Sequence, residues 1–199
     1  MSPAIEDKDL TAGKVATRVP GETGVWVLVL GDLSLFTAFF VNYLNDRGHN
    51  YTEFVAAQAK VNQVYGLVNT IILLCSSWLV IAAVQSARSE RVKRASNLLF
   101  GAAALGVVFL VLKILEYSEK ITVGIVPNTN LFYNHYFFLT GLHFVHVVLG
   151  VALLLLMSQY GRFNAPVESK LRNLESGASF WHLVDLLWIA LFALLYLLP

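Results

Sequence analysis

The sequence is poor in cysteine and in charged residues, and both shortages limit what the protein can be. Among its 199 residues there is one cysteine, Cys75, which excludes an intramolecular disulfide and a zinc or iron–sulfur site built from cysteines. The sequence has no C-x-x-C-H motif, so covalent attachment of c-type haem is excluded too. Charged residues make up 14% of the chain and the formal net charge is +1, whereas a soluble domain has about 25% charged residues. This composition excludes a disordered or nucleic-acid-binding chain and argues against a water-soluble enzyme.

What the sequence has in abundance is apolar residues, at 57% of the chain and a mean hydropathy of +0.64. A membrane-spanning helix needs about 20 mostly apolar residues, because the hydrocarbon core is about 30 Å thick. Five runs satisfy this requirement: Val25–Leu44, Tyr65–Val84, Leu98–Leu115, Tyr136–Met157 and Phe180–Leu198. The sequence therefore predicts an all-α, polytopic membrane protein, with a polar tail over residues 1–24 and a five-helix transmembrane bundle over residues 25–199.

The distribution of lysine and arginine predicts the orientation of the bundle. Ten basic residues lie in the N-terminal tail and in the second and fourth loops: Lys8, Lys14, Arg18, Arg88, Arg91, Lys93, Arg94, Arg162, Lys170 and Arg172. Three lie in the loops of the opposite side: Arg47, Lys60 and Lys120. We expect the N-terminus in the cytoplasm and the C-terminus outside. The tail has no apolar core, so we expect no cleavable signal peptide and an uncleaved anchor over Val25–Leu44.

Two local patterns refine the helices. Residues Asn50–Gln63 carry Phe54 and Gln58 at helical spacing, which predicts an outward extension of the second spanning helix. Ala102 and Gly106 have the small-xxx-small spacing that allows membrane helices to approach closely.

Ionisable residues inside the spans carry the functional information, because such residues are costly in a membrane and usually face a cavity, the bundle interior or a partner. Asp32 lies in the middle of the first span. It is either a proton-related carboxyl or a contact to a partner subunit, or else a neutral carboxyl hydrogen-bonded within the bundle. Lys113 and Glu116 lie three residues apart near the end of the third span, which predicts an ion pair, either buried or reaching towards the interface.

Two histidines in the fourth span, His143 and His146, also lie three residues apart. Together with His182 and Asp185 of the fifth span they could ligate a metal, but a recognised di-metal or metalloprotease pattern is missing, so we expect no metal. We expect interhelical hydrogen bonds or lipid headgroup contacts instead. In the fifth span, Asp185 would orient the imidazole of His182, and Trp181 suits an anchor at headgroup level.

Four motifs in this order resemble the cytochrome c oxidase subunit III family of the haem–copper oxidases, over about residues 19–198. Residues Tyr136–Val147 are similar to the family's F-x-x-T-G-x-H-x-x-H-V stretch, and Trp181–Trp188 to its W-H-F-V-D-x-x-W stretch. Asn69–Ser77 resembles N-T-x-x-L-L-x-S-S, and Glu116-Tyr117 resembles an E-Y that closes a family helix. The number of spans resembles the short, five-span form.

The opening Val19–Trp26 resembles the branch associated with nitric oxide reductase, and two substitutions fit that branch. Asp32 stands where typical oxidase members carry glutamate, and Lys113 where they often carry glutamine. The resemblance implies an accessory, non-catalytic subunit without haem or copper of its own. Such a subunit packs beside catalytic subunit I of an oxidase or a nitric oxide reductase, holds phospholipids and sustains proton uptake. We expect it in the cell inner (plasma) membrane.

By the resemblance, His143, His146, Trp181, His182 and Asp185 fix helices or contact lipid, and Asp32 and Glu116 are intramembrane carboxyl sites. For the surface facing the partner we expect aromatic residues, with Phe36, Phe39 and Phe40 as candidates. Two rival hypotheses remain open at this point. One is a quinol-oxidising haem or metal protein that uses the histidines, and the other is a small proton-coupled transporter that uses Asp32, Glu116 and Asp185.

Overall fold

The computed structural model describes residues 23–159 and 167–198, and these residues are helical apart from short connections. The helices are α1 (Thr23–His49), α2 (Tyr51–Gln58), α3 (Gln63–Arg88), α4 (Val92–Thr122), α5 (Leu131–Ser158) and α6 (Val167–Phe192). A 3-10 turn, Pro127–Thr129, precedes α5, and a π-helical turn, Ala193–Leu197, continues α6. Five helices, all but the short α2, are long and apolar enough to cross a membrane. The predicted all-α architecture with five spans is thus confirmed.

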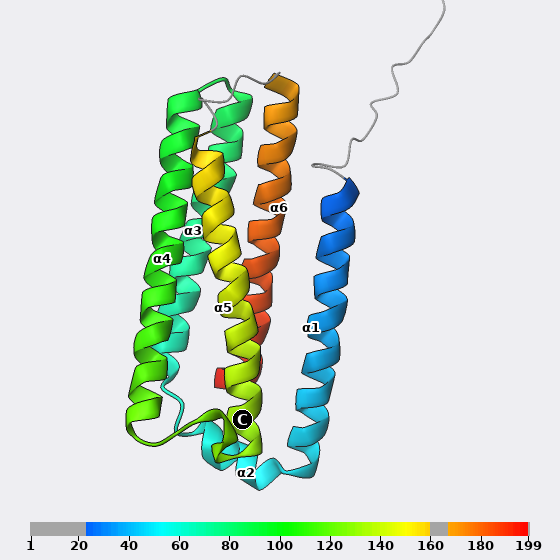
Figure 1. Ribbon diagram of the computed structural model, residues 1–199, viewed down its shortest axis with the longest axis vertical. Helices are drawn as coiled ribbons and strands as arrows, with labels where there is room; N and C mark the ends of the chain where they lie inside the picture. The colour runs from blue at the N-terminus through cyan, green and yellow to red at the C-terminus, as the bar shows by residue number, and fades with distance from the viewer. Residues whose placement is uncertain (1–22, 160–166, 199) are drawn as a thin grey trace, which may run out of the picture.

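The spanning helices form a four-helix group with a fifth helix beside it (Figure 1). Helix α4 packs against α3 and α5, and α6 packs against the same two helices from the other side. Helix α1 contacts α5 and α6. The start of α1, the α3–α4 turn and the end of α5 lie at one end of the molecule, and α2 lies at the other (Figure 1).

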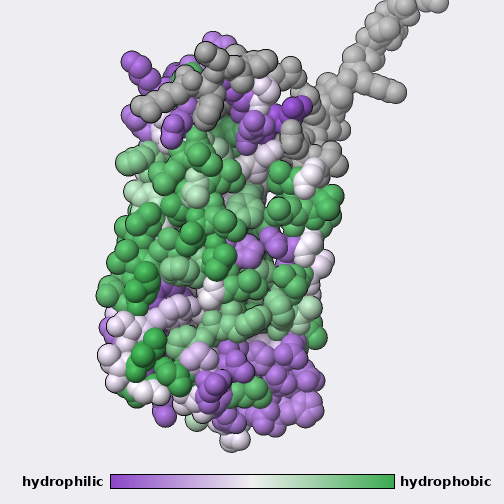
Figure 2. Space-filling view, viewed as in Figure 1, coloured by the Kyte–Doolittle hydropathy of each residue, from purple (hydrophilic) through white to green (hydrophobic). Residues whose placement is uncertain are grey.

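The surface matches a protein embedded in a bilayer. Figure 2 shows a band of hydrophobic residues between two polar ends. Large apolar side chains such as Trp78, Phe100 and Leu149 are more than half exposed. In water this exposure would be costly, so the band suits the apolar interior of a bilayer.

The helices extend beyond the apolar runs at nearly every end. Helix α4 begins at Val92 rather than Leu98, and α6 begins at Val167 rather than Phe180. A helix satisfies its backbone groups internally, so it can continue through the polar headgroup region, where hydropathy gives no signal.

The predicted outward extension of the second span over Asn50–Gln63 is wrong. Residues Tyr51–Gln58 form the separate helix α2, the chain turns after it, and α3 starts anew at Gln63. The side chain of Asn62 accepts a hydrogen bond from the backbone N–H of Val64 at 3.0 Å, an N-cap that fixes this new start.

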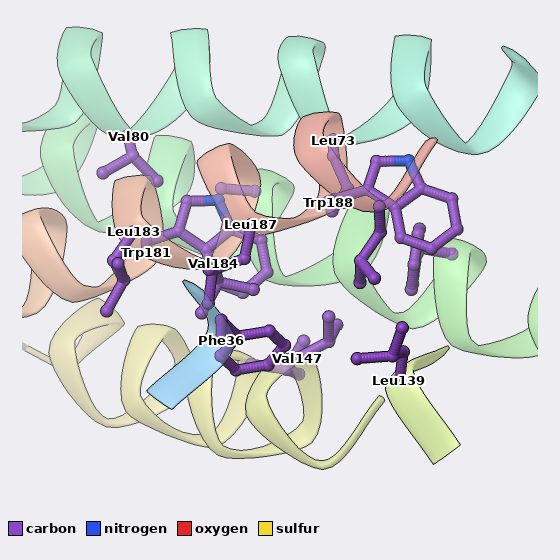
Figure 3. Packing of buried hydrophobic residues seen from close by; sticks show 14 of the residues in the cluster. Phe36, Leu73, Val80, Leu139, Val147, Trp181, Leu183, Val184, Leu187 and Trp188 are labelled. Carbon is purple, nitrogen blue, oxygen red and sulfur yellow. The ribbon is translucent and has the colours of Figure 1, made fainter. Parts of the chain in front are cut away.

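The core of the four-helix group is organised around two tryptophans of α6. Trp181 and Trp188 are fully buried and point between the neighbouring helices (Figure 3). We expected Trp181 at headgroup level, and it lies in the interior instead. Phe36 of α1, a candidate for the partner surface, is also fully buried and packs into this core (Figure 3). The other two candidates, Phe39 and Phe40, are partly buried against the same core.

Glycines make room for Trp181. A Cβ atom at Gly150 of α5 would lie 2.6 Å from Cε3 of Trp181, and one at Gly106 of α4 would lie 2.9 Å from its Cη2. The Ala102/Gly106 spacing therefore marks a real close approach, in which the smallest residues leave a recess for the largest side chain. A rigid indole cannot retreat from an added methyl group without moving the helix.

Replacing Gly150 with alanine should destabilise the protein by about 1–3 kcal/mol, the usual cost of overpacking a core. The matched control is Gly141→Ala on the same helix, where an added Cβ meets nothing within 4 Å. The control should be neutral or slightly stabilising, because alanine favours helix. Thermal unfolding in mild detergent measures both. Equal melting temperatures for the two variants would contradict the proposed close packing.

Candidate functional site

A buried ion pair lies where α4, α5 and the π-helical turn meet. Lys113 Nζ is 2.8 Å from Glu116 Oε2, and the two side chains are 0% and 1% exposed. Both residues belong to α4 and face inward on the same side of the helix, as the three-residue spacing predicts. The alternative that the pair reaches towards the membrane surface is wrong, because both side chains are buried inside the bundle.

Two tyrosines complete the hydrogen bonding of this pair. The hydroxyl of Tyr136 on α5 donates to Glu116 Oε1 at 2.6 Å, and that of Tyr196 in the π-helical turn lies 2.9 Å from the same oxygen. Lys113 Nζ in turn donates to Tyr196 Oη at 2.7 Å and to Tyr136 Oη at 3.2 Å. We call Lys113, Glu116, Tyr136 and Tyr196 the buried polar cluster. Sequence reasoning found its two charges and missed both tyrosines.

Aromatic rings enclose the ammonium group of Lys113. Its Nζ lies 5.0–5.4 Å from the ring centroids of Tyr117, Tyr136, Trp188 and Tyr196. Ring faces carry partial negative charge and attract a cation, more strongly where water is absent. The buried polar cluster therefore gives the desolvated lysine a counter-ion and a set of aromatic rings. Both offset the free-energy cost of burying an ion pair.

Asp32 of α1 meets His146 of α5. Asp32 Oδ2 is 3.4 Å from His146 Nε2, and the ring of Phe36 packs edge-on against the imidazole. The other ring nitrogen of His146 is 2.9 Å from the backbone carbonyl oxygen of Leu142, which can only accept, so this nitrogen carries a hydrogen. A hydrogen bond to Asp32 then needs one more proton, either on Nε2 or on the carboxyl group.

A second carboxylate–histidine contact joins the same helices. Asp46 Oδ2 of α1 lies 2.8 Å from His135 Nε2 of α5, and Tyr43 packs edge-on against the imidazole. Sequence reasoning missed this pair because Asp46 and His135 fall just outside the apolar runs Val25–Leu44 and Tyr136–Met157. The pair could have been predicted from a carboxylate near the end of one spanning helix and a histidine near the start of another, at the same end of the bundle.

On α6, His182 finds a different partner from the expected one. Its Nδ1 is 2.7 Å from Ser77 Oγ of α3 and 3.8 Å from Asp185 Oδ2. The serine hydroxyl, rather than the carboxylate, therefore orients the imidazole. Asp185 is 5% exposed, and within the described ranges neither of its carboxylate oxygens has a hydrogen-bond partner.

His143 and His146 do not act together. His146 faces α1, whereas His143 is fully buried between the rings of Phe109 and Trp188. Neither ring nitrogen of His143 has a hydrogen-bond partner in the part of the chain that the structure describes. In the same residues, no three His, Cys, Asp or Glu side chains gather in a way that could hold a metal ion. The polar side chains mainly join one helix to another.

Replacing Lys113 with methionine should destabilise the protein by about 3–5 kcal/mol, because it leaves the Glu116 carboxylate buried without its counter-ion. The double variant Lys113→Met with Glu116→Met removes both charges and should regain most of that loss. Thermal unfolding in detergent measures each variant, with Lys60→Met at an exposed position as the control. A double variant no more stable than the single one would refute the ion pair.

Comparisons with known proteins find relatives over most of the chain. The family model for cytochrome c oxidase subunit III matches residues 15–198. A cytochrome c oxidase subunit 3 from Thermostichus vulcanus is 30% identical over 179 residues, covering 88% of this chain and 86% of the relative. A cytochrome bo(3) ubiquinol oxidase subunit 3 from Pseudomonas aeruginosa is 30% identical over 176 residues, covering 88% and 83%.

A third relative, named heme-copper oxidase subunit I+III, comes from Aeropyrum pernix. It is 27% identical over 181 residues, which cover 88% of this chain and 22% of the relative. The match of the family model spans nearly the whole chain, including all five spanning helices. The chain belongs to the cytochrome c oxidase subunit III family.

Proposed function

We propose that this chain, an accessory subunit of a haem–copper oxidase, supports the catalytic subunit without a haem or copper of its own. The proposal rests on the contacts that the polar side chains make within the chain. The buried polar cluster is satisfied within the chain, and three histidines contact Asp32, Asp46 and Ser77 of other helices. Groups arranged in this way hold helices in place, which suits a supporting subunit.

Membership of the family implies association with catalytic subunit I of a haem–copper oxidase. The relative named subunit I+III supports subunit I as the direct partner, since this chain matches only 22% of that longer protein. Phe36 is buried and is not available for the contact, so we propose that exposed apolar side chains within the hydrophobic band meet the partner and the lipid.

We propose that the chain lies in the cell inner (plasma) membrane with its N-terminus in the cytoplasm. The support is the excess of lysine and arginine in the tail and in the second and fourth loops. The structure brings the start of α1, the α3–α4 turn and the end of α5 to the same end of the molecule, as this orientation requires (Figure 1). The residues of the tail before position 23 lie outside the described ranges.

Asp32 is the residue we propose for a role in proton uptake by the complex. Its carboxylate lies 3.4 Å from the imidazole of His146 near the middle of a spanning helix, and an ionisable group at such a position is usually functional. Glu116 is not a candidate for the same role, because three partners already occupy its carboxylate. We also propose bound phospholipid, which the broad lipid-facing band supports.

Nitric oxide reductase as the partner remains a prediction from sequence. It rests on Val19–Trp26, of which the first half lies outside the described residues, and on Asp32 and Lys113. The three relatives above are named as oxidase subunits.

Purification of the tagged chain in mild detergent tests the accessory role. We expect a haem-containing catalytic subunit to co-purify, and we expect this chain to be colourless once the subunits are separated. Visible spectroscopy and mass spectrometry of the eluate give the result and identify the partner. A chain that emerges alone, or that keeps haem after separation, would refute the proposal.

A further inference from the structure

A pocket of about 240 Å³ lies between the second half of α3 and the first half of α6. The two helices run antiparallel, so that Ser77 of α3 meets His182 of α6, and Arg88 of α3 meets Glu175 of α6. The pocket lies between these two contacts, with His182 in its lining at one end and Arg88 and Glu175 at the other. All of its lining residues belong to the part of the chain that the structure describes.

This pocket is polar at both ends and apolar between them. Gln85 lies at one end, just beyond the apolar run Tyr65–Val84, and His182 lies about 10 Å deeper along the helices. Apolar side chains line the space between these ends: Ile81, Val84 and Ala178. A phospholipid has its polar groups at one end and its acyl chains at the other, so it does not match this order.

At the deeper end, His182 can donate a hydrogen bond into the pocket. Its Nδ1 lies 2.7 Å from Ser77 Oγ, and a serine hydroxyl that donates to Nδ1 leaves the hydrogen of a neutral imidazole on Nε2. Behind the ring, the buried Asp185 carboxyl lies 3.8 Å from the same Nδ1 and has no hydrogen-bond partner within the described ranges. A carboxylate there favours the protonated imidazole, which also carries a hydrogen on Nε2. In both forms the exposed part of the ring has a donor.

At the shallower end, Gln85 supplies a second donor. Its side chain is exposed and makes no hydrogen bond within residues 23–159 and 167–198. Arg88 Nη2 and Nε lie 2.8 and 3.2 Å from Glu175 Oε1, so the two charges at this end offset each other. The hydroxyl of Ser179 donates to the backbone carbonyl of Glu175 and is therefore occupied. A free amide beside a neutralised ion pair suits an uncharged ligand better than an anionic headgroup.

The distance between the two donors fits a six-membered ring that carries oxygens at opposite edges. The oxygens of a para-quinone lie about 5 Å apart and each hydrogen bond adds about 3 Å, so the donor atoms must be about 11 Å apart. Ser77 marks the level of His182, and Gln85 follows it by eight residues, which is about 12 Å along α3. Aliphatic side chains between the donors leave flat apolar walls for the faces of such a ring.

We infer that this pocket binds the headgroup of a membrane-soluble para-quinone. One carbonyl oxygen accepts from His182 and the opposite one from Gln85. The ring lies against Ile81, Val84 and Ala178, and its apolar tail passes into the surrounding lipid. The inference concerns binding without electron transfer and does not depend on the proposed accessory role. It adds to the subunit a site for a small neutral molecule on the surface formed by α3 and α6.

The test uses the assembled complex in its membrane and a para-quinone with a photoreactive azide on its tail. After irradiation, mass spectrometry of the digested chain should locate adducts on the peptides of α3 and α6 that line the pocket. Ile81→Trp fills the pocket from a position that is 45% exposed, and it should lower this labelling about tenfold. Gln85→Leu removes one donor from an exposed position and should lower labelling by about two- to tenfold.

The matched control is Ile71→Trp on the same helix, which is 52% exposed, does not line the pocket and should label as the unchanged complex does. Equal labelling of the pocket in the Ile81→Trp and Ile71→Trp complexes would overturn the inference. So would an unchanged complex without adducts on α3 and α6, or labelling that phosphatidylglycerol displaces and unlabelled quinone does not. Adducts on the catalytic subunit map to its own peptides, and co-purified haem reports assembly. Failure of the accessory role and failure of the quinone pocket are therefore distinguishable.

Discussion

The buried ion pair between Lys113 and Glu116 is the interaction on which the arrangement of the four-helix group depends. Two opposite charges without access to water are stable only if their geometry is good and their remaining hydrogen-bonding capacity is satisfied. Tyr136 and Tyr196 meet that demand only when α5 and the π-helical turn lie in one relative position. The pair is local to α4, yet it determines how two other segments must pack.

The contacts of the π-helical turn also follow from the hydrogen bonding that the buried ion pair requires. Tyr196 reaches the charges from its place in this turn, and its backbone carbonyl accepts from the side chain of Gln63 on α3 at 3.0 Å. The carbonyl of Leu194 accepts from the hydroxyl of Tyr43 on α1 at 3.2 Å. A π-helical turn leaves carbonyl groups displaced from the regular helical ladder, and here two neighbouring helices supply the missing donors.

The sequence predicted the parts of this fold that depend on local physics. The five spans follow from hydropathy, and the Lys113–Glu116 pair follows from helical spacing. The partners Tyr136 and Tyr196 lie 20 and 80 positions from Glu116, and nothing about a tyrosine in an apolar run reveals its distant contact. Trp181 was misplaced because its usual preference for the headgroup region gave way to a recess at Gly106 and Gly150 that only tertiary structure reveals. The helix break after Gln58 depends on Asn62 as an N-cap, a signal that the continuing apolar pattern hid.

The attachment of α1 has a consequence for how the chain is made. Its carboxylates Asp32 and Asp46 contact histidines of α5, so Asp32 and its partner His146 are 114 positions apart along the chain. At a synthesis rate of about 5–20 residues per second, α1 waits roughly 5–25 s before its partner helix exists. During that time it must remain inserted as a single helix with Asp32 near its middle, a placement that costs about 2.5–3.5 kcal/mol. Many apolar residues surround Asp32, and several of them are exposed on the surface of the folded bundle. They therefore also keep α1 in the membrane before the other helices have been made.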